Sequence, residues 1–311
     1  MRRHGVVRRI AYTACGLLVF LVLFAHPFFA ITRPSGGHIL VAEGWMHREG
    51  LIEARDLYRK GGYAHLYLTG TIRPFAYYLT EGERIQLHFG SPITERIEVS
   101  AGGLPSTRWS LITGNDTLIS VQASANATSH GIELNGLPVR DLRFEVHGQE
   151  PSPPGTAIAF IGSLRVDGAE AHAVANIGLV GTDGSITPGW PTHAEEARAI
   201  LLEEGMKEEE LTAIPTIHFT GGKTFSSART FVRYAEQNDL GPFDVATLAV
   251  HARRTWKGYV VANGGPEGVG IIALYDPWCQ RWWWWLNPYG WYQVVKELLA
   301  LPTTLASGAG P

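Results

Sequence analysis

"HILVAEGW", residues 38–45, begins the part of the chain whose pattern decides the fold class. This apolar run predicts a buried strand, and "REGLIEARDLYRKGG", residues 48–62, has the apolar spacing of an amphipathic helix that stops at glycine. A second short strand, "HLYLTG", follows at 65–70. Strand, helix and strand in this order favour a parallel sheet, because the helical crossover returns the second strand in the direction of the first.

The pattern changes from about residue 83 to residue 188. Short alternating runs such as "RIQLHFG" (84–90) and "RIEVSA" (96–101) are separated by Gly, Pro, Asn and Ser, as in a small all-β sandwich. From residue 189 the alternation of helices and strands returns. We therefore expect an α/β protein with a three-layer, Rossmann-like, doubly wound and mainly parallel sheet that is interrupted by an inserted all-β sandwich. The expected segments are 1–33 (basic end and transmembrane anchor), 34–82 (α/β domain, first part), 83–188 (insert), 189–302 (α/β domain, second part) and 303–311 (disordered tail).

The N-terminus predicts a membrane anchor. Four arginines in the first nine residues precede Ile10 to Ile31, a stretch without Asp, Glu, Lys or Arg. As a helix it would span ~33 Å, enough to cross a bilayer, and the basic end would stay in the cytoplasm with the main domains periplasmic or extracellular. A cleaved signal peptide is the alternative. Leu23 and Phe28 stand where cleavage would need small residues, which favours the uncleaved anchor.

Composition excludes some classes of function. The 311 residues have a formal net charge of -3 and a pI near 6.5, so we expect no nucleic-acid partner. The two cysteines, Cys15 and Cys279, lie at opposite ends of the chain and have no metal-binding spacing. We therefore expect neither a disulfide framework nor a metal site, and the sequence does not specify a cofactor.

Candidate site residues follow the predicted parallel strands, because ligands of open α/β sheets bind beyond the carboxyl ends of the strands. His251 and Glu43 are the candidate proton-transfer groups. "TGGKT", residues 220–224, offers backbone N–H groups to an anion at the start of a helix, although it is only a fragment of a phosphate-binding loop. The candidate ligand-binding residues are Gly44, Trp45, Thr69, Gly70, Lys223, Thr224, Ser226, Arg253, Arg254 and Trp283.

Each candidate also has a structural interpretation. The arginines of "HARR", residues 251–254, could hold a phosphate or carboxylate in a bidentate manner, or pair with surface carboxylates. His251 could be a general acid or base, or a structural turn residue. Glu43 could orient a ligand hydroxyl or a base, or cap a neighbouring loop.

"RWWWWLNPYGWY", residues 281–292, contains four consecutive tryptophans. Consecutive helical residues point to all sides, so the four side chains cannot share one core stripe. We expect a connecting loop that borders the cleft next to His251. Three roles stay open for these side chains: packing in the core and rim, a lid that faces a ligand or lipid, and contact with the insert.

The α/β segments resemble a known family. "ILVAEGW" (39–45), "GGKTFSSARTF" (221–231), "LAVHARRTWKGYVVANG" (248–264) and "WWWWLNPYGWYQVVKELLA" (282–300) are similar, in this order, to the YdcF-like family of bacterial envelope proteins. The resemblance implies a three-layer fold with a cleft at the strand ends. For the family it implies nucleotide-type ligand binding in some members and envelope or peptidoglycan roles in others.

The insert resembles a second family. "GIELNGLPVRDL" (131–142) and "GTAIAFIGSLRVDGAEAH" (155–172) are similar to calcium-dependent carbohydrate-binding modules of the xylan-binding type. Residues 161–163 read Ile, Gly and Ser where those modules use an acidic residue, so a plain β-sandwich is the expectation.

Two functions are expected from these observations. The first is a membrane-anchored envelope enzyme, a hydrolase or transferase, that acts on an anionic or phosphorylated glycan or a lipid-linked precursor. The alternative is a noncatalytic envelope module that binds glycan through the insert.

Overall fold

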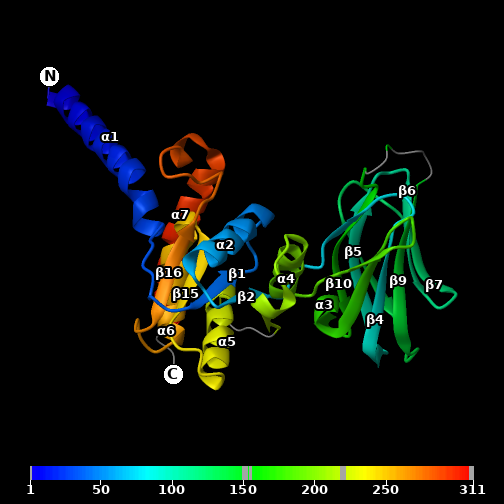
Figure 1. Cartoon of the computed structure of the whole chain (residues 1–311). Coiled ribbons are helices and arrows are strands. Elements are labelled where there is room, and N and C mark those ends of the chain that lie inside the picture. Colours follow the sequence, from blue (N-terminus) through cyan, green and yellow to red (C-terminus); the bar gives the residue numbers. More distant parts are fainter. Residues whose placement is uncertain (1, 149–152, 154–155, 218–221, 308–311) are drawn as a thin grey trace. The chain divides into compact units, whose positions relative to one another are not determined.

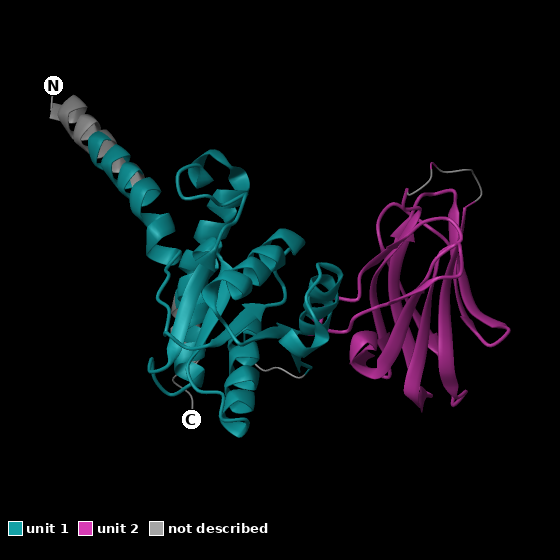
Figure 2. Ribbon diagram, viewed as in Figure 1, with its two compact units in different colours: residues 1–71, 193–311 teal, residues 72–192 magenta. Residues whose placement is uncertain are grey.

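The computed structural model describes residues 2–148, 153, 156–217 and 222–307, and the chain divides into two compact units (Figures 1 and 2). Unit 1 comprises Met1–Thr71 and His193–Pro311, and unit 2 comprises Ile72–Thr192. Unit 2 begins and ends outside the insert expected at 83–188. An isolated bridge between Ile72 and Thr192 joins the two ends of this unit.

Unit 1 is built on a five-stranded sheet whose neighbouring strands are all parallel. The order across the sheet is β14-β2-β1-β15-β16, so the chain winds outward from β1 in both directions. The direction of winding reverses between β1 and β15. At such a reversal an open α/β sheet leaves a crevice at the carboxyl ends of its strands. The strands are β1 (Ile39–Glu43), β2 (His65–Thr71), β14 (Leu211–Thr216), β15 (Phe243–Leu248) and β16 (Val269–Leu274).

Helices cover both faces of this sheet (Figure 1). Successive side chains of a strand point to opposite faces, and β1 shows this directly. Leu40 and Ala42 pack with residues of α2 (Arg48–Gly61) and α4 (His193–Glu203), whereas Val41 packs with residues of α5 (Lys223–Gln237) and α6 (Ala252–Ala262). Because it lies between two helical layers, the strand is apolar on both sides. This explains why the run at residues 38–45 is apolar without alternation.

The remaining helices of unit 1 connect or flank these elements. Short 3-10 turns are η1 (Glu208–Glu210), η2 (Ala249–His251) and η3 (Trp284–Leu286), and the longer helices are α1 (Arg2–Phe29) and α7 (Pro288–Ser307). Because α7 extends to Ser307, residues 303–307 of the expected disordered tail are helical, while 308–311 lie outside the described residues.

In its described residues, unit 2 consists of two antiparallel sheets and one short helix, α3 (Ala171–Val174). The first sheet has the order β11-β10-β5-β8 with β3 paired to β10, and the second has the order β13-β12-β4-β9-β6-β7. The strands are β3 (Tyr77–Leu79), β4 (Arg84–Ile93), β5 (Arg96–Gly103), β6 (Thr107–Thr113), β7 (Asp116–Gln122), β8 (Thr128–Glu133), β9 (Val139–Gly148), β10 (Ala159–Val166), β11 (Ala169–Glu170), β12 (Ala175–Val180) and β13 (Ile186–Pro188).

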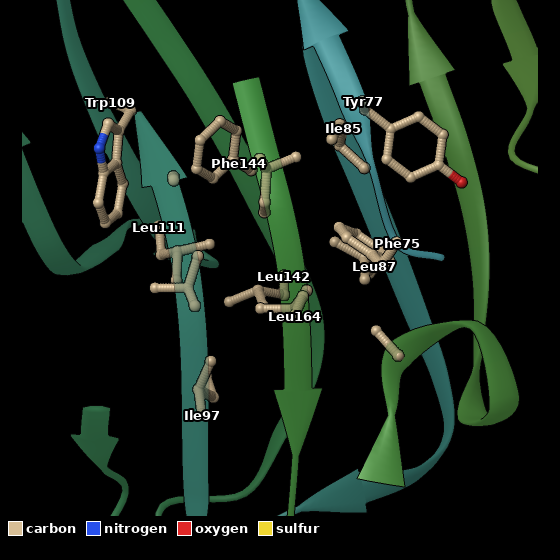
Figure 3. Close-up of a cluster of buried hydrophobic side chains, with 14 of the residues drawn as sticks. Phe75, Tyr77, Ile85, Leu87, Ile97, Trp109, Leu111, Leu142, Phe144 and Leu164 are labelled. Carbon is tan, nitrogen blue, oxygen red and sulfur yellow. The ribbon is translucent and has the colours of Figure 1, made fainter. Parts of the chain in front are cut away.

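Alternating side chains of these strands form one apolar core (Figure 3). In β4, Ile85 and Leu87 are buried while Gln86 between them is only partly buried. Trp109 is fully buried and stacks on Phe144 of the neighbouring strand, with the ring centroids 5.4 Å apart. The alternation seen in the sequence therefore corresponds to one core-facing side of each strand.

The fold class expected for the chain is wrong. The expectation was one mainly parallel, doubly wound sheet, an inserted all-β sandwich and a transmembrane helix. The described chain has one parallel sheet of five strands and two antiparallel sheets of five and six strands, and none of its described helices is apolar enough to cross a membrane. Most of these strands belong to the inserted segment. Its short runs are joined by tight turns, which pair neighbouring strands antiparallel without helical crossovers.

The expected transmembrane helix is also wrong. None of the helices in the described part of the chain combines the length and the continuous apolar character that crossing a bilayer requires. In α1, part of the apolar stretch belongs to the core of unit 1, where Ala25 and Phe29 pack with Trp284. The predictions of an anchor over Ile10 to Ile31, of a cytoplasmic N-terminus and of periplasmic or extracellular main domains are contradicted by this finding.

Candidate functional site

A cavity of about 290 Å³ lies in unit 1 beyond the carboxyl ends of β1 and β2. Seven of the residues singled out in the sequence line it: Glu43, Trp45, Thr69, Lys223, Thr224, His251 and Arg254. Thr71, His193, Ser227 and Lys296 complete the lining. The strand-end position of the predicted residues brings them together, because parallel strands end at the same edge of the sheet.

Glu43 is the last residue of β1 and is only 2% exposed. Its carboxylate accepts hydrogen bonds from the hydroxyl of Thr247, at 2.5 Å, and from that of Thr255, at 3.0 Å. These bonds connect the end of β1 to β15 and α6. A buried carboxylate needs such donors, because an unsatisfied charge would be expensive to bury.

His251 ends the η2 turn that follows β15 and is 3% exposed. Its Nδ1 atom lies 2.7 Å from the carboxylate of Glu297, which α7 contributes. The ring of Trp45 packs edge-on against the imidazole, with centroids 4.7 Å apart. The imidazole is thus fixed both by a hydrogen bond and by an aromatic contact.

Arg254 binds protein groups with most of its guanidinium. Nε and Nη2 donate to the two carboxylate oxygens of Glu297 at 2.6 and 3.1 Å, and Nη1 donates to the hydroxyl of Thr224 at 3.0 Å. Burial by itself lowers the pKa of Arg254, but the hydrogen bonds and charge of Glu297 outweigh it and raise this pKa. Arg254 therefore connects α5, α6 and α7 and has little capacity left for a ligand.

Glu297 is fully buried and contacts two residues of the cavity lining, His251 and Arg254. Burial alone would raise the pKa of its carboxyl group, but the hydrogen bonds from His251 and Arg254, together with the charges of these groups, lower the pKa to about 2. Glu297 is therefore an anion at any pH near neutrality.

Two lysines are the available cations of the cavity. Lys223 is the first residue of α5 and is exposed, and Lys296 lies on α7 beside Glu297. Within the described ranges, no carboxylate forms an ion pair with either ammonium group. Burial lowers the pKa of Lys296, and the charge of Arg254 adds to this lowering while Glu297 and Glu43 oppose it. An anionic ligand would stabilise both charged lysines.

The start of α5 adds to this positive environment. Its N-cap, Gly222, has extended backbone and makes no side-chain cap, so the first N–H groups of the helix have no capping oxygen there. Gly221, the other glycine of "TGGKT", lies outside the described residues. Among those described, no three His, Cys, Asp or Glu side chains are grouped as metal ligands.

Gly44 and Gly70 serve the packing of the site. A Cβ atom at Gly44 would lie 2.4 Å from the carbonyl oxygen of His193, and one at Gly70 would lie 2.6 Å from the nitrogen of Ala194. Both positions need glycine because the first turn of α4 lies directly against the strand ends. Ser226 is buried in α5 and does not line the cavity, whereas the adjacent Ser227 does.

Arg253 points to a different neighbour. Its Nε donates to the carbonyl oxygen of Phe28, and its guanidinium carbon lies 4.1 Å from the centroid of the Phe28 ring. It does not line the cavity. The two arginines of "HARR" therefore have separate partners.

The four consecutive tryptophans also differ in burial. Trp284 is fully buried and packs with Val250, Cys279 and Val294, whereas Trp282, Trp283 and Trp285 are 64%, 61% and 40% exposed. None of the four lines the cavity. Trp283 was expected to border the cleft and instead lies on the surface.

Glu297 and Lys296 are the charged residues of the site that sequence reasoning missed, and Thr71 and His193 of the cavity lining were not predicted either. Glu297 and Lys296 are the only charged residues in the twenty-residue sequence of α7. A single pair of adjacent charges in a helix without other charged residues is the signal that could have indicated them, because buried charges occur where they have partners.

Unit 2 has a hollow of its own. A groove of about 460 Å³ lies over β4, β9 and β12 and has a lining rich in hydrogen-bonding side chains. The polar lining residues are Gln86, His88, Asp141, Arg143 and Asn176. His88 and Asp141 form an ion pair at 2.7 Å if the histidine is protonated.

Comparison with known proteins gives a limited result. No family model matches the chain, and no curated protein matches its sequence, so neither comparison supports the YdcF-like resemblance. Solved structures that are similar to it include the carbohydrate-binding module CBM36 in complex with calcium and xylotriose, which is 18% identical over 30% of this chain and 78% of that protein, with a TM-score of 0.19. The PA14 sugar-binding domain from an RTX adhesin is 10% identical over 39% of this chain and 73% of that domain, with a TM-score of 0.15. The likeness to sugar-binding domains is weak.

Proposed function

We propose that unit 1 is an enzyme that hydrolyses a phosphate ester of a sugar or glycan. The observation that carries this proposal is the convergence of Lys223, Lys296 and His251 on one cavity. The two ammonium groups have no carboxylate partner among the described residues, which favours a doubly charged ligand group such as phosphate. The imidazole beside them can move a proton.

The reaction step uses these groups in defined roles. A water oxygen forms a bond to phosphorus while Nε2 of His251 takes a proton from that water. The bond between phosphorus and the sugar oxygen breaks, and its electron pair goes to the sugar oxygen, which receives the proton back from the imidazolium. Lys223 and Lys296 stabilise the negative charge on the phosphoryl oxygens. The products are the free sugar and inorganic phosphate.

The test is release of inorganic phosphate from glucose 1-phosphate by the full-length protein. We expect His251→Gln to lower kcat by about 10²–10⁴-fold and the double change Lys223→Ala, Lys296→Ala to raise KM. Arg253→Ala is the control, because its side chain lies outside the cavity, and it should leave both constants unchanged. Absence of turnover in the wild type would refute the proposal.

Noncatalytic glycan binding by unit 2 is the second candidate. The polar groove over β4, β9 and β12 favours it, because amide, imidazole, carboxylate and guanidinium groups can all bind sugar hydroxyls. Retardation of the protein in a gel that contains xylan tests this function. Binding that is lost in a His88→Ala, Asn176→Ala variant and retained in His251→Gln would select the second candidate.

A further inference from the structure

We propose that Glu297 is a positioning residue, whose carboxylate holds the His251 imidazole in the tautomer that presents an unprotonated Nε2 to the cavity. The inference rests on the proposed function for its catalytic meaning. The tautomer itself is a property of the folded protein that can be measured without any substrate.

The hydrogen-bond partners of Nδ1 decide the tautomer. Two groups approach this atom, a carboxylate oxygen of Glu297 at 2.7 Å and Nη2 of Arg254 at 3.2 Å. An ionised carboxylate can only accept a hydrogen bond, and a guanidinium can only donate one. The shorter contact to the carboxylate requires a hydrogen on Nδ1, and a nitrogen that donates this hydrogen cannot also accept one from Arg254. Arg254 is therefore a neighbour of Nδ1 whose Nε and Nη2 groups donate to Glu297.

The other ring nitrogen is then the one available to a ligand. In a neutral imidazole with hydrogen on Nδ1, Nε2 carries the lone pair. His251 lines the cavity, and no residue in the described part of the chain forms a hydrogen bond with Nε2. The edge-on contact with Trp45 limits rotation of the ring, so the direction of Nε2 is fixed together with its protonation.

Arg254 keeps Glu297 in the ionised form that this role requires. A carboxylate without exposed surface would tend to be protonated, and a protonated Glu297 could donate to Nδ1 and favour the opposite tautomer. The two bonds from Arg254 stabilise the ionised form. Arg254 thus acts through Glu297 as its counter-ion, and not as the bidentate ligand for an anion that the sequence suggested.

A purely structural role for Glu297 would lead to a different result. If its contacts with His251 and Arg254 served stability alone, loss of the carboxylate would lower the melting temperature without changing the tautomer of His251 in the folded protein. If Glu297 positions His251, the tautomer must change as well. The two roles are therefore separable in one protein preparation.

The first experiment is nitrogen-15 NMR of the histidine rings in the full-length wild type at pH 8, with His251 assigned by the signal that His251→Gln removes. We expect a protonated Nδ1 and an unprotonated Nε2. A wild-type His251 with its hydrogen on Nε2 would overturn the proposal. This test uses the wild type alone and therefore does not depend on whether a Glu297 variant folds.

The second experiment uses Glu297→Gln, whose amide can donate to Nδ1, with Glu267→Gln as a control that removes the same charge at an exposed position. We expect the Nε2 signal of His251 to move toward the protonated form in Glu297→Gln and to stay unchanged in the control. With glucose 1-phosphate, kcat should fall by about 10²-fold or more with little change in KM. An unchanged tautomer in a folded Glu297→Gln protein would overturn the proposal. Wild-type protein with the expected tautomer but no turnover would instead refute the proposed function.

Discussion

Arg253 and Arg254 are consecutive residues whose guanidinium groups bind different parts of unit 1. Arg254 donates to the buried carboxylate of Glu297, and Arg253 contacts the carbonyl group and ring of Phe28 at the end of α1. Neighbours in a helix point about 100° apart, so the sequence "HARR" places two similar side chains on different faces. Their substitutions should therefore have different consequences.

Arg254→Ala should cost roughly 3–5 kcal/mol of unfolding free energy, because it removes the guanidinium that binds both oxygens of the buried Glu297 carboxylate. Arg253→Ala should cost about 1 kcal/mol, since the Arg253 side chain is more exposed and its partner is a carbonyl group. Urea unfolding followed by circular dichroism measures both values. Equal losses of unfolding free energy in the two variants would show that the ion pair with Glu297 contributes no more to stability than the contacts of Arg253 do.

Glu297 should also contribute a pH-dependent part of the stability. Its pKa is lowered from 4.5 to about 2 in the folded protein, so the folded state favours the ionised form. The contribution is fully present above pH 4.5 and is lost as the pH falls from 4.5 toward 2. The difference in melting temperature between wild type and Glu297→Gln should therefore shrink across this interval. A difference that stays constant from pH 6 to pH 2.5 would contradict the lowered pKa.

Local elements were the most predictable part of the fold. The apolar run at 38–45 and the helical spacing at 48–62 correspond to β1 and α2, because each pattern expresses which sides of the element are buried. The apolar N-terminal stretch was misjudged for a related reason. The absence of charged residues was taken as sufficient for a membrane span, but the described helix is not apolar enough for one, and its final turns pack on Trp284 and Val294.

The site was predictable to the extent that it follows strand ends. Glu43, Thr69 and His251 lie where β1, β2 and β15 end, so a topological rule suffices to bring them together. Glu297 comes from a helix that follows the last strand, 43 residues after its partner Arg254. No local pattern records this pairing, because it depends on how α7 packs against α6.

Glycine at position 70 should be required for the first turn of α4 to reach the strand ends. In Gly70→Ala the new Cβ would lie 2.6 Å from the backbone nitrogen of Ala194, so α4 must shift, at a cost of about 1–3 kcal/mol. Gly90→Ala is the matched control, since no atom lies within 4 Å of its Cβ position. Thermal unfolding of the two variants measures the difference. A Gly70→Ala protein as stable as the control would show that α4 adjusts without cost.

Phosphate binding should weaken at alkaline pH through Lys296. Burial lowers the pKa of this lysine below 10.5, and only the ammonium form attracts phosphate. Affinity for inorganic phosphate, measured by isothermal titration calorimetry, should therefore already fall as the pH rises toward 10.5. Lys296→Arg should retain its affinity over the same range, because arginine stays protonated. A parallel loss in both proteins would assign the effect to another group.

The consecutive tryptophans should differ sharply in their contribution to stability. Trp284 is fully buried among Val250, Cys279 and Val294, and its indole nitrogen donates to the carbonyl oxygen of Val22. Trp284→Ala should cost roughly 3–5 kcal/mol, because it removes a large buried ring and leaves a cavity between α1 and α7. Trp283, one residue earlier, is 61% exposed, and Trp283→Ala should change the unfolding free energy by no more than about 0.5 kcal/mol. Urea unfolding followed by circular dichroism compares the two variants directly. Losses of similar size would mean that the exposed indole also packs in solution, against a surface other than the core of unit 1.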